Sequence, residues 1–122
     1  MQPEKFSIRS RIKSFSHAFA GIRQFVGREH NARIHLVATV AVIIAGFVWH
    51  VSYTDAAILT IVIGLVWTAE AINTCVERLA NLITKEQHPE IKIIKDLAAG
   101  AVLITAIAAV ITGLFIFIPK FI

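Results

Sequence analysis

The stretch AAILTIVIGLVWTA at residues 56–69, followed directly by EAINTCVERLANLI at 70–83, decides the fold. The first part is almost wholly apolar, and the second carries carboxylates and amides. A membrane-spanning helix needs about 20 mostly apolar residues, so the apolar part alone is too short. We therefore expect one helix over 56–81 that crosses a membrane and continues through its polar end.

Two further apolar runs could span a bilayer. They predict helices over 34–51 and 95–118, joined to the helix over 56–81 by short polar links. Hydrophobic residues make up 57% of the 122 residues and charged residues only 16%, against about 25% charged residues in soluble domains. We expect a single all-α integral membrane domain over 1–122, with three transmembrane helices.

The segment 6–28 has a different pattern, in which apolar residues recur every three or four positions and basic residues occupy the other faces. This spacing predicts an amphipathic helix, whose apolar stripe contains Ile8, Ile12, Phe15, Phe19, Ile22 and Val26. A basic amphipathic helix beside membrane spans is typical of an interfacial helix on anionic lipid headgroups. The alternative is a helix packed on the rest of the chain. The membrane already accounts for the basic residues, so no nucleic-acid partner is expected.

Basic residues also predict the orientation. With three spans, every one of the 12 Lys and Arg residues except Lys120 falls on the side that holds the N-terminus. Cytoplasmic flanks of membrane helices are enriched in basic residues. We therefore expect a cytoplasmic N-terminus.

A polar stripe runs along the end of the helix over 56–81. Glu70, Asn73, Glu77 and Asn81 are spaced by three or four residues, which places them on one helix face. Counting about 1.5 Å per residue from Asp55 puts Glu70 about 22 Å into the membrane and Glu77 about 33 Å. An ionisable group at the depth of Glu70 indicates a protein interior or a functional cavity.

Other charged residues stand at the cytoplasmic ends of the remaining spans. Glu29 precedes the first span, and Lys95 and Asp96 stand just before the apolar part of the third, so we expect them at the same depth as Glu70 and Glu77. Carboxylates of this kind suit Mg²⁺ together with substrate phosphates, and Lys95 offers a point charge for phosphate. His35 and His50 are interpreted as interfacial rather than catalytic, and Cys75 as a small buried packing residue.

Two interpretations without an enzymatic reaction remain open at this point. Buried acids also occur in small transporters and proton relays, but here the acids other than Asp55 cluster towards one side of the membrane. A non-catalytic membrane assembly protein would have the same topology. A measurement of catalytic turnover by purified protein would separate an enzyme from both.

EAINTCVE at 70–77 and KIIKDLAAGAV at 92–102 resemble the two signature motifs of the small prokaryotic diacylglycerol kinases, a family that includes undecaprenol kinases. REHNARIHL at 28–36 resembles the motif before the first span of this family. The resemblance implies a multi-pass enzyme of the bacterial cytoplasmic (inner) membrane that moves the γ-phosphoryl group of ATP to a lipid hydroxyl. It also implies Mg²⁺ and a homotrimer with sites shared between chains.

The resemblance further implies roles for individual residues. Glu70 would be the catalytic base, and Glu29 and Glu77 would bind the metal and thereby ATP. The other candidate ATP contacts are Lys95, Asp96, Asn73, Glu86 and His88. Asn81 departs from the family motif, which has Asp there, so a charge-dependent role at this position is in doubt. The lipid could be undecaprenol or diacylglycerol, and likeness to the Gram-positive branch favours undecaprenol.

Overall fold

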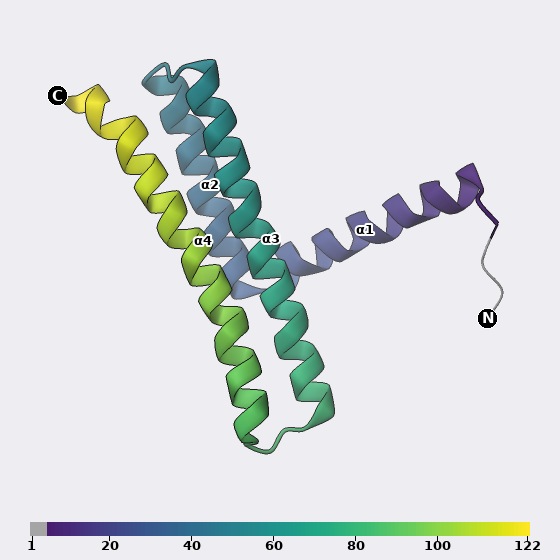
Figure 1. The fold of residues 1–122 in the computed structure, drawn as a ribbon. Coiled ribbons are helices and arrows are strands. Elements are labelled where there is room, and N and C mark those ends of the chain that lie inside the picture. The colour runs from purple at the N-terminus through teal and green to yellow at the C-terminus, as the bar shows by residue number, and fades with distance from the viewer. Residues whose placement is uncertain (1–4) are drawn as a thin grey trace.

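The computed structural model describes residues 5–122, and these residues form four helices without strands. Helix α1 is Ile8–Arg28, α2 is His30–Val48, α3 is Tyr53–Ile83 and α4 is Pro89–Phe121. Figure 1 shows α2, α3 and α4 side by side, with α1 projecting away from them. Among the described residues, α2, α3 and α4 are long and apolar enough to cross a membrane. The predicted all-helical fold with three candidate spans is confirmed.

All four helices have ends that differ from the ranges expected from the sequence, α1 only in that it begins at Ile8 rather than at 6. The range 34–51 becomes His30–Val48. This helix ends early because His50 adopts a left-handed φ of 50° and the Val51 N–H donates to the Gly46 carbonyl at 3.1 Å. This arrangement closes a helix C-terminus. Hydropathy alone does not reveal it, since the left-handed residue is not a glycine.

Capping side chains explain the other early helix starts. Ser52 accepts a hydrogen bond from the Asp55 N–H at 3.1 Å, so α3 begins at Tyr53 rather than at 56 and continues to Ile83. His88 accepts one from the Glu90 N–H at 3.1 Å, with Pro89 in the first turn of α4. Polar side chains and proline are favourable at these places. As a result, Lys95 and Asp96 lie within α4 and not before it.

Helix α1 is joined to α2 by an elbow at a single residue. Glu29 has an extended backbone (φ −93°, ψ 127°), so it ends α1 and begins α2. Arg33 donates to the Gly27 carbonyl across this elbow at 2.7 Å. Helices α3 and α4 continue past the level of the elbow (Figure 1). The hairpin that joins them therefore extends beyond the level at which α1 leaves the bundle.

Most of the apolar stripe of α1 has no partner within the chain. Ile8, Ile12 and Phe19 are all more than 60% exposed, and no residue of α1 is buried. Large apolar side chains left in this state indicate contact with a membrane or another protein. The alternative, a helix packed on the rest of the chain, applies only to its C-terminal end, where Phe25 packs edge-on against Trp67 with ring centroids 6.0 Å apart.

A second exposed apolar stripe runs along α3. Its members recur at alternating spacings of four and three residues: Ile61, Leu65, Ile72, Leu79 and Leu82, with Thr68 and Cys75 in the intervening positions. Cys75 was expected to be buried, but it is exposed in the single chain because it lies on this stripe. Such spacing is typical of a seam between packed helices.

Candidate active site

Glu70 is the centre of the site and is only 3% exposed. Its Oε1 accepts a hydrogen bond from Asn31 Nδ2 at 3.0 Å, and its Oε2 lies 3.6 Å from His35 Nε2. Asn31 and His35 are one turn apart on α2, so a single helix face holds both oxygens of the carboxylate. A buried carboxylate requires such polar partners, because burying an unpaired charge is costly.

The sequence interpretation missed both of these partners. Asn31 has no role in that interpretation beyond its place in the motif at 28–36, and His35 is interpreted there as interfacial. The signal that could have found them is the recurrence of Asn31, His35 and Thr39 every four residues on α2. Thr39 extends this polar row, since Trp67 Nε1 on α3 donates to Thr39 Oγ1 at 2.9 Å.

One helical turn further along α3 lies a second pair of candidate residues. Asn73 is 6% exposed, and its Nδ2 donates to Glu77 Oε1 at 3.2 Å. The Oδ1 of Asn73 is buried without a hydrogen-bond partner. A buried acceptor of this kind is an exception that requires an explanation, and a bound hydroxyl, water or ion would satisfy it.

Glu29 reaches the same helix from the elbow. Its Oε1 lies 2.6 Å from the Arg78 guanidinium, and both side chains are partly exposed. No cluster of three or more His, Cys, Asp or Glu within residues 5–122 is arranged to hold a metal. Glu29 and Glu77 nevertheless have the hard oxygen donors that Mg²⁺ prefers, and Mg²⁺ is commonly held by one or two carboxylates plus substrate phosphates.

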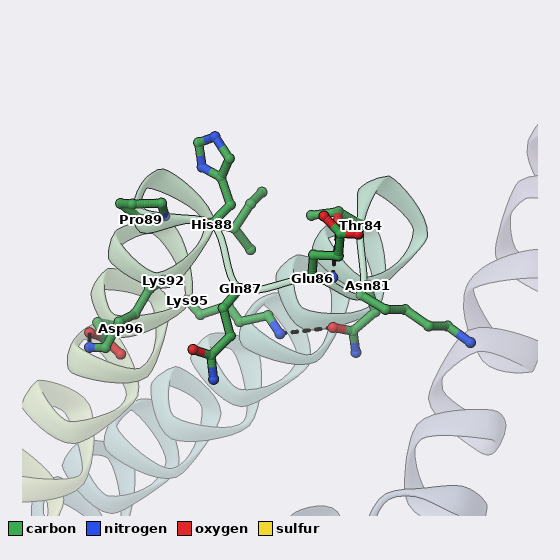
Figure 2. A pocket seen from close by; sticks show the side chains of 11 residues that line it. Asn81, Thr84, Glu86, Gln87, His88, Pro89, Lys92, Lys95 and Asp96 are labelled. Carbon is green, nitrogen blue, oxygen red and sulfur yellow. Dashed lines mark hydrogen bonds and ion pairs between the residues drawn. The ribbon is translucent and has the colours of Figure 1, made fainter.

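The remaining candidates surround a groove of about 560 Å³ at the α3–α4 hairpin, shown in Figure 2. Lys95 Nζ donates to Asn81 Oδ1 at 2.8 Å, and Lys92 pairs with Asp96 at 2.6 Å. Glu86 and His88 are exposed in the link between the helices. The groove therefore combines three lysines with carboxylate and amide groups. Its polar and charged lining includes Asn81, Lys85, Glu86, His88, Lys92, Lys95 and Asp96.

The structure does not bring all the expected residues together within one chain. Lys95 contacts α3 at Asn81, which lies about 16 Å beyond Glu70 along the helix axis at 1.5 Å per residue. The expectation that Glu70, Lys95 and Asp96 share one depth is therefore wrong for a single chain. The sequence interpretation placed Lys95 and Asp96 at the membrane edge of the third span. In the structure α3 and α4 continue beyond Glu70 as a long hairpin, and Lys95 and Asp96 lie in that extension.

An apolar groove of about 470 Å³ lies between α2, α3 and α4. Its polar lining side chains are His35, Thr39 and Trp67, and the rest of its lining is aliphatic, aromatic or glycine. His35 also contacts Glu70, so the groove ends beside the buried carboxylate. An apolar groove with a few polar groups at one end is typical of a site for a mainly apolar ligand.

A bundle of membrane-spanning helices with a buried carboxylate and a lysine-lined groove has the features of a membrane-bound phosphotransferase. A family model described as prokaryotic diacylglycerol kinase matches residues 16–117. The chain is 42% identical over 109 residues to an undecaprenol kinase of Bacillus subtilis, covering 89% of each protein. It is 39% identical over 109 residues to a diacylglycerol kinase of Synechocystis sp., covering 88% of this chain and 62% of that protein.

The chain belongs to the prokaryotic diacylglycerol kinase family and is a multi-pass membrane lipid kinase. Its activity uses ATP as the phosphoryl donor and a lipid as the acceptor. This assignment confirms the resemblance seen in the sequence motifs. It also favours the kinase interpretation over a transporter or a non-catalytic assembly protein.

Proposed function

We propose that the chain transfers the γ-phosphoryl group of ATP to the hydroxyl of undecaprenol, with Glu70 as the general base. The observation that carries this proposal is the burial of Glu70, at 3% exposure, beside an apolar groove. A long isoprenoid chain would occupy this groove and bring its terminal hydroxyl to Glu70. The higher identity and more complete coverage of the undecaprenol kinase relative support this choice of lipid.

The reaction then needs few protein groups. The lipid hydroxyl oxygen forms a bond to the γ-phosphorus as the bond from that phosphorus to its β-bridging oxygen breaks, and ADP leaves. The hydroxyl proton passes to an oxygen of Glu70. Asn31 and His35 orient this carboxylate through contacts at 3.0 and 3.6 Å. The buried Oδ1 of Asn73 can accept a hydrogen bond near the reacting groups.

Charge neutralisation is the other requirement of phosphoryl transfer. In this proposal Glu29 and Glu77 hold Mg²⁺, which neutralises phosphate charge when bound. Lys95 contacts the nucleotide phosphates, Asp96 supports the nucleotide site, and Glu86 and His88 lie on the adenosine side. Asn81 keeps a hydrogen bond to Lys95 at 2.8 Å but offers no charge to it. Lys95 therefore keeps more of its positive charge available for phosphate than it would beside an aspartate.

The proposed membrane placement follows from the apolar stripe of α1. With α1 on the anionic headgroups of the cytoplasmic leaflet, the elbow at Glu29 lies at the interface. Glu70 is then close to the same level, because Asn31 contacts it directly. The α3–α4 hairpin extends into the cytoplasm, where ATP is available. This arrangement lets the lipid hydroxyl arrive from the membrane and the nucleotide from water.

Turnover on matched lipids tests the choice of acceptor. Purified protein in detergent should phosphorylate undecaprenol with a kcat/KM at least about 10-fold higher than diacylglycerol, since the differences in apolar contacts along the groove add up over the chain. The measurement is the transfer of labelled γ-phosphate into each lipid over a range of concentrations. Equal or higher kcat/KM on diacylglycerol would contradict undecaprenol as the preferred acceptor.

Replacing Asn31 by alanine tests the positioning of the base. Loss of a hydrogen bond to a charged, buried group has a free-energy cost of about 1.5–3 kcal/mol, so we expect kcat to fall at least about 10-fold with little change in the KM for ATP. His30→Ala is the matched control, because His30 is exposed beside Asn31 on the same helix. A normal kcat for Asn31→Ala would remove Asn31 from the support of Glu70.

A further inference from the structure

Arg78 is a charged residue that the proposed function leaves without a role. It is on α3 directly after Glu77, and its guanidinium lies 2.6 Å from Glu29 Oε1 at the elbow. The contact joins residues that are 49 positions apart in the chain. Its side chain is 52% exposed and that of Glu29 is 30% exposed. Arg78 therefore retains solvent access and room to move.

The contact involves one of the two proposed metal ligands. A guanidinium and a divalent cation both require the negative charge of the same carboxylate. A metal that binds Glu29 must therefore reduce the attraction between Glu29 and Arg78. Since Arg78 follows Glu77 in sequence, the released guanidinium would remain close to the second proposed ligand and to any phosphate bound there.

The chemistry of arginine suits a phosphate as its next partner. Its planar guanidinium presents several N–H donors and pairs with phosphate oxygens in a bidentate manner. Arg78 and Asn81 are three positions apart on α3, so they are neighbours on the helix surface. Lys95 on α4 donates a hydrogen bond to Asn81, so its ammonium group and Arg78 both lie near the C-terminal end of α3.

We propose that Arg78 neutralises Glu29 in the nucleotide-free enzyme and transfers its guanidinium to an ATP phosphate when the metal binds Glu29. This inference rests on the proposed metal role of Glu29. It makes Arg78 a competitor of the metal before ATP binds and a ligand of the phosphates afterwards. Removing Arg78 should consequently strengthen the binding of metal alone and weaken the binding of nucleotide.

The first experiment uses Mn²⁺ alone as a paramagnetic probe of the metal site. The concentration for half-saturation of purified Arg78→Gln protein, measured from the free Mn²⁺ signal without nucleotide, should be about 2- to 5-fold lower than for the parent. This range corresponds to what a partly exposed ion pair contributes. Arg23→Gln removes the same charge from α1 and should leave Mn²⁺ binding unchanged. Unchanged or weaker Mn²⁺ binding by Arg78→Gln would overturn the competition.

The second experiment measures the KM for ATP at saturating Mg²⁺. We expect Arg78→Gln to raise it about 3- to 10-fold, because charge-assisted hydrogen bonds to a phosphate are lost. Arg78→Lys should give an intermediate value, since lysine keeps the charge but not the fork. If the ion pair merely stabilised the fold, removing it would not strengthen metal binding and at the same time weaken nucleotide binding. A normal KM in Arg78→Gln would overturn the transfer to phosphate.

Glu29→Gln separates failure of this inference from failure of the proposed function. If Glu29 binds metal, Glu29→Gln weakens Mn²⁺ binding, and adding Arg78→Gln to it produces no further tightening. Normal Mn²⁺ binding by Glu29→Gln would remove Glu29 from the metal site and would contradict the proposed function itself. Weakened binding by Glu29→Gln together with no effect of Arg78→Gln would overturn only the role of Arg78.

Discussion

Glu70→Gln should reduce lipid phosphorylation by about 10²–10⁴-fold, the range that a general base contributes to proton transfer. Glutamine has nearly the same shape as glutamate and keeps an acceptor for Asn31 Nδ2, which bonds to Glu70 at 3.0 Å. It cannot take the proton from the lipid hydroxyl. The loss should therefore appear in kcat, with the KM for ATP changing much less.

Glu90→Gln is the matched control for this experiment. Glu90 lies in the exposed first turn of α4 and has no role in the proposed site. Its variant should retain the turnover of the parent protein, and both variants should have the same mass in detergent. Parent-like turnover by Glu70→Gln would contradict the assignment of Glu70 as the base. If the Glu70→Gln variant did not assemble, its mass in detergent would show this. The experiment would then be repeated with Glu70→Asp, which keeps a base but shortens its reach.

The overall fold could be predicted because its main signals are local. The apolar runs and the stripe of α1 appear directly in the sequence, and they become three candidate spans and an exposed amphipathic helix. Helix ends were less predictable, because they depend on single hydrogen bonds. The left-handed His50 and the caps at Ser52 and His88 move helix boundaries by several residues without a clear hydropathy signal.

The candidate site was predictable only in part for a related reason. Its polar stripe on α3 is a local pattern, so Glu70, Asn73 and Glu77 could be selected from spacing and motif. Its partners come from elsewhere in the chain, as in the Asn31–Glu70 and Glu29–Arg78 contacts. Such contacts depend on how far one helix is shifted along another. A sequence pattern does not specify this shift.

The exposed stripe of α3 gives a physical reason to expect more than one chain in the active enzyme. Its part beyond Glu70 includes Ile72, Leu79 and Leu82, which are 58–84% exposed in the single chain. In the proposed placement this part lies at or outside the membrane surface, where lipid tails do not cover it. Apolar side chains exposed to water in a seam-like spacing favour association with the same helix of other chains.

Small residues on the last span, α4, offer a second possible contact between chains, because small residues let membrane helices approach closely. Ala101 and Ala108 are exposed there, but Thr105 and Thr112 are partly buried within the chain and donate to carbonyls of their own helix. Helix α4 packs mainly along α3 of the same chain. The α3 stripe is therefore the better candidate for the contact between chains, and we propose a homotrimer built around it.

The separation between Glu70 and Lys95 bears on how a trimer could form its sites. Within one chain Lys95 contacts Asn81, about 16 Å along α3 from Glu70. A closed trimer keeps each residue at the same level in all three chains, so it changes which side chains face one another but not this axial separation. The sharing of sites between chains therefore requires a direct test.

Mixing two inactive chains provides this test. Glu70→Gln and Lys95→Ala proteins should each be inactive alone. When they are unfolded together and reassembled in detergent with lipid, activity should return, because some mixed trimers contain a Glu70 from one chain opposite a Lys95 from another. We expect recovery of a few tenths of the parent activity at equal amounts, an estimate that follows from random assembly of shared sites. Two Glu70→Gln preparations reassembled by the same procedure are the control and should remain inactive. If Glu70 and Lys95 acted within the same chain, every site in a mixed trimer would retain one defect and no activity would return. A fully active monomer, identified by its mass in detergent, would exclude the trimer itself.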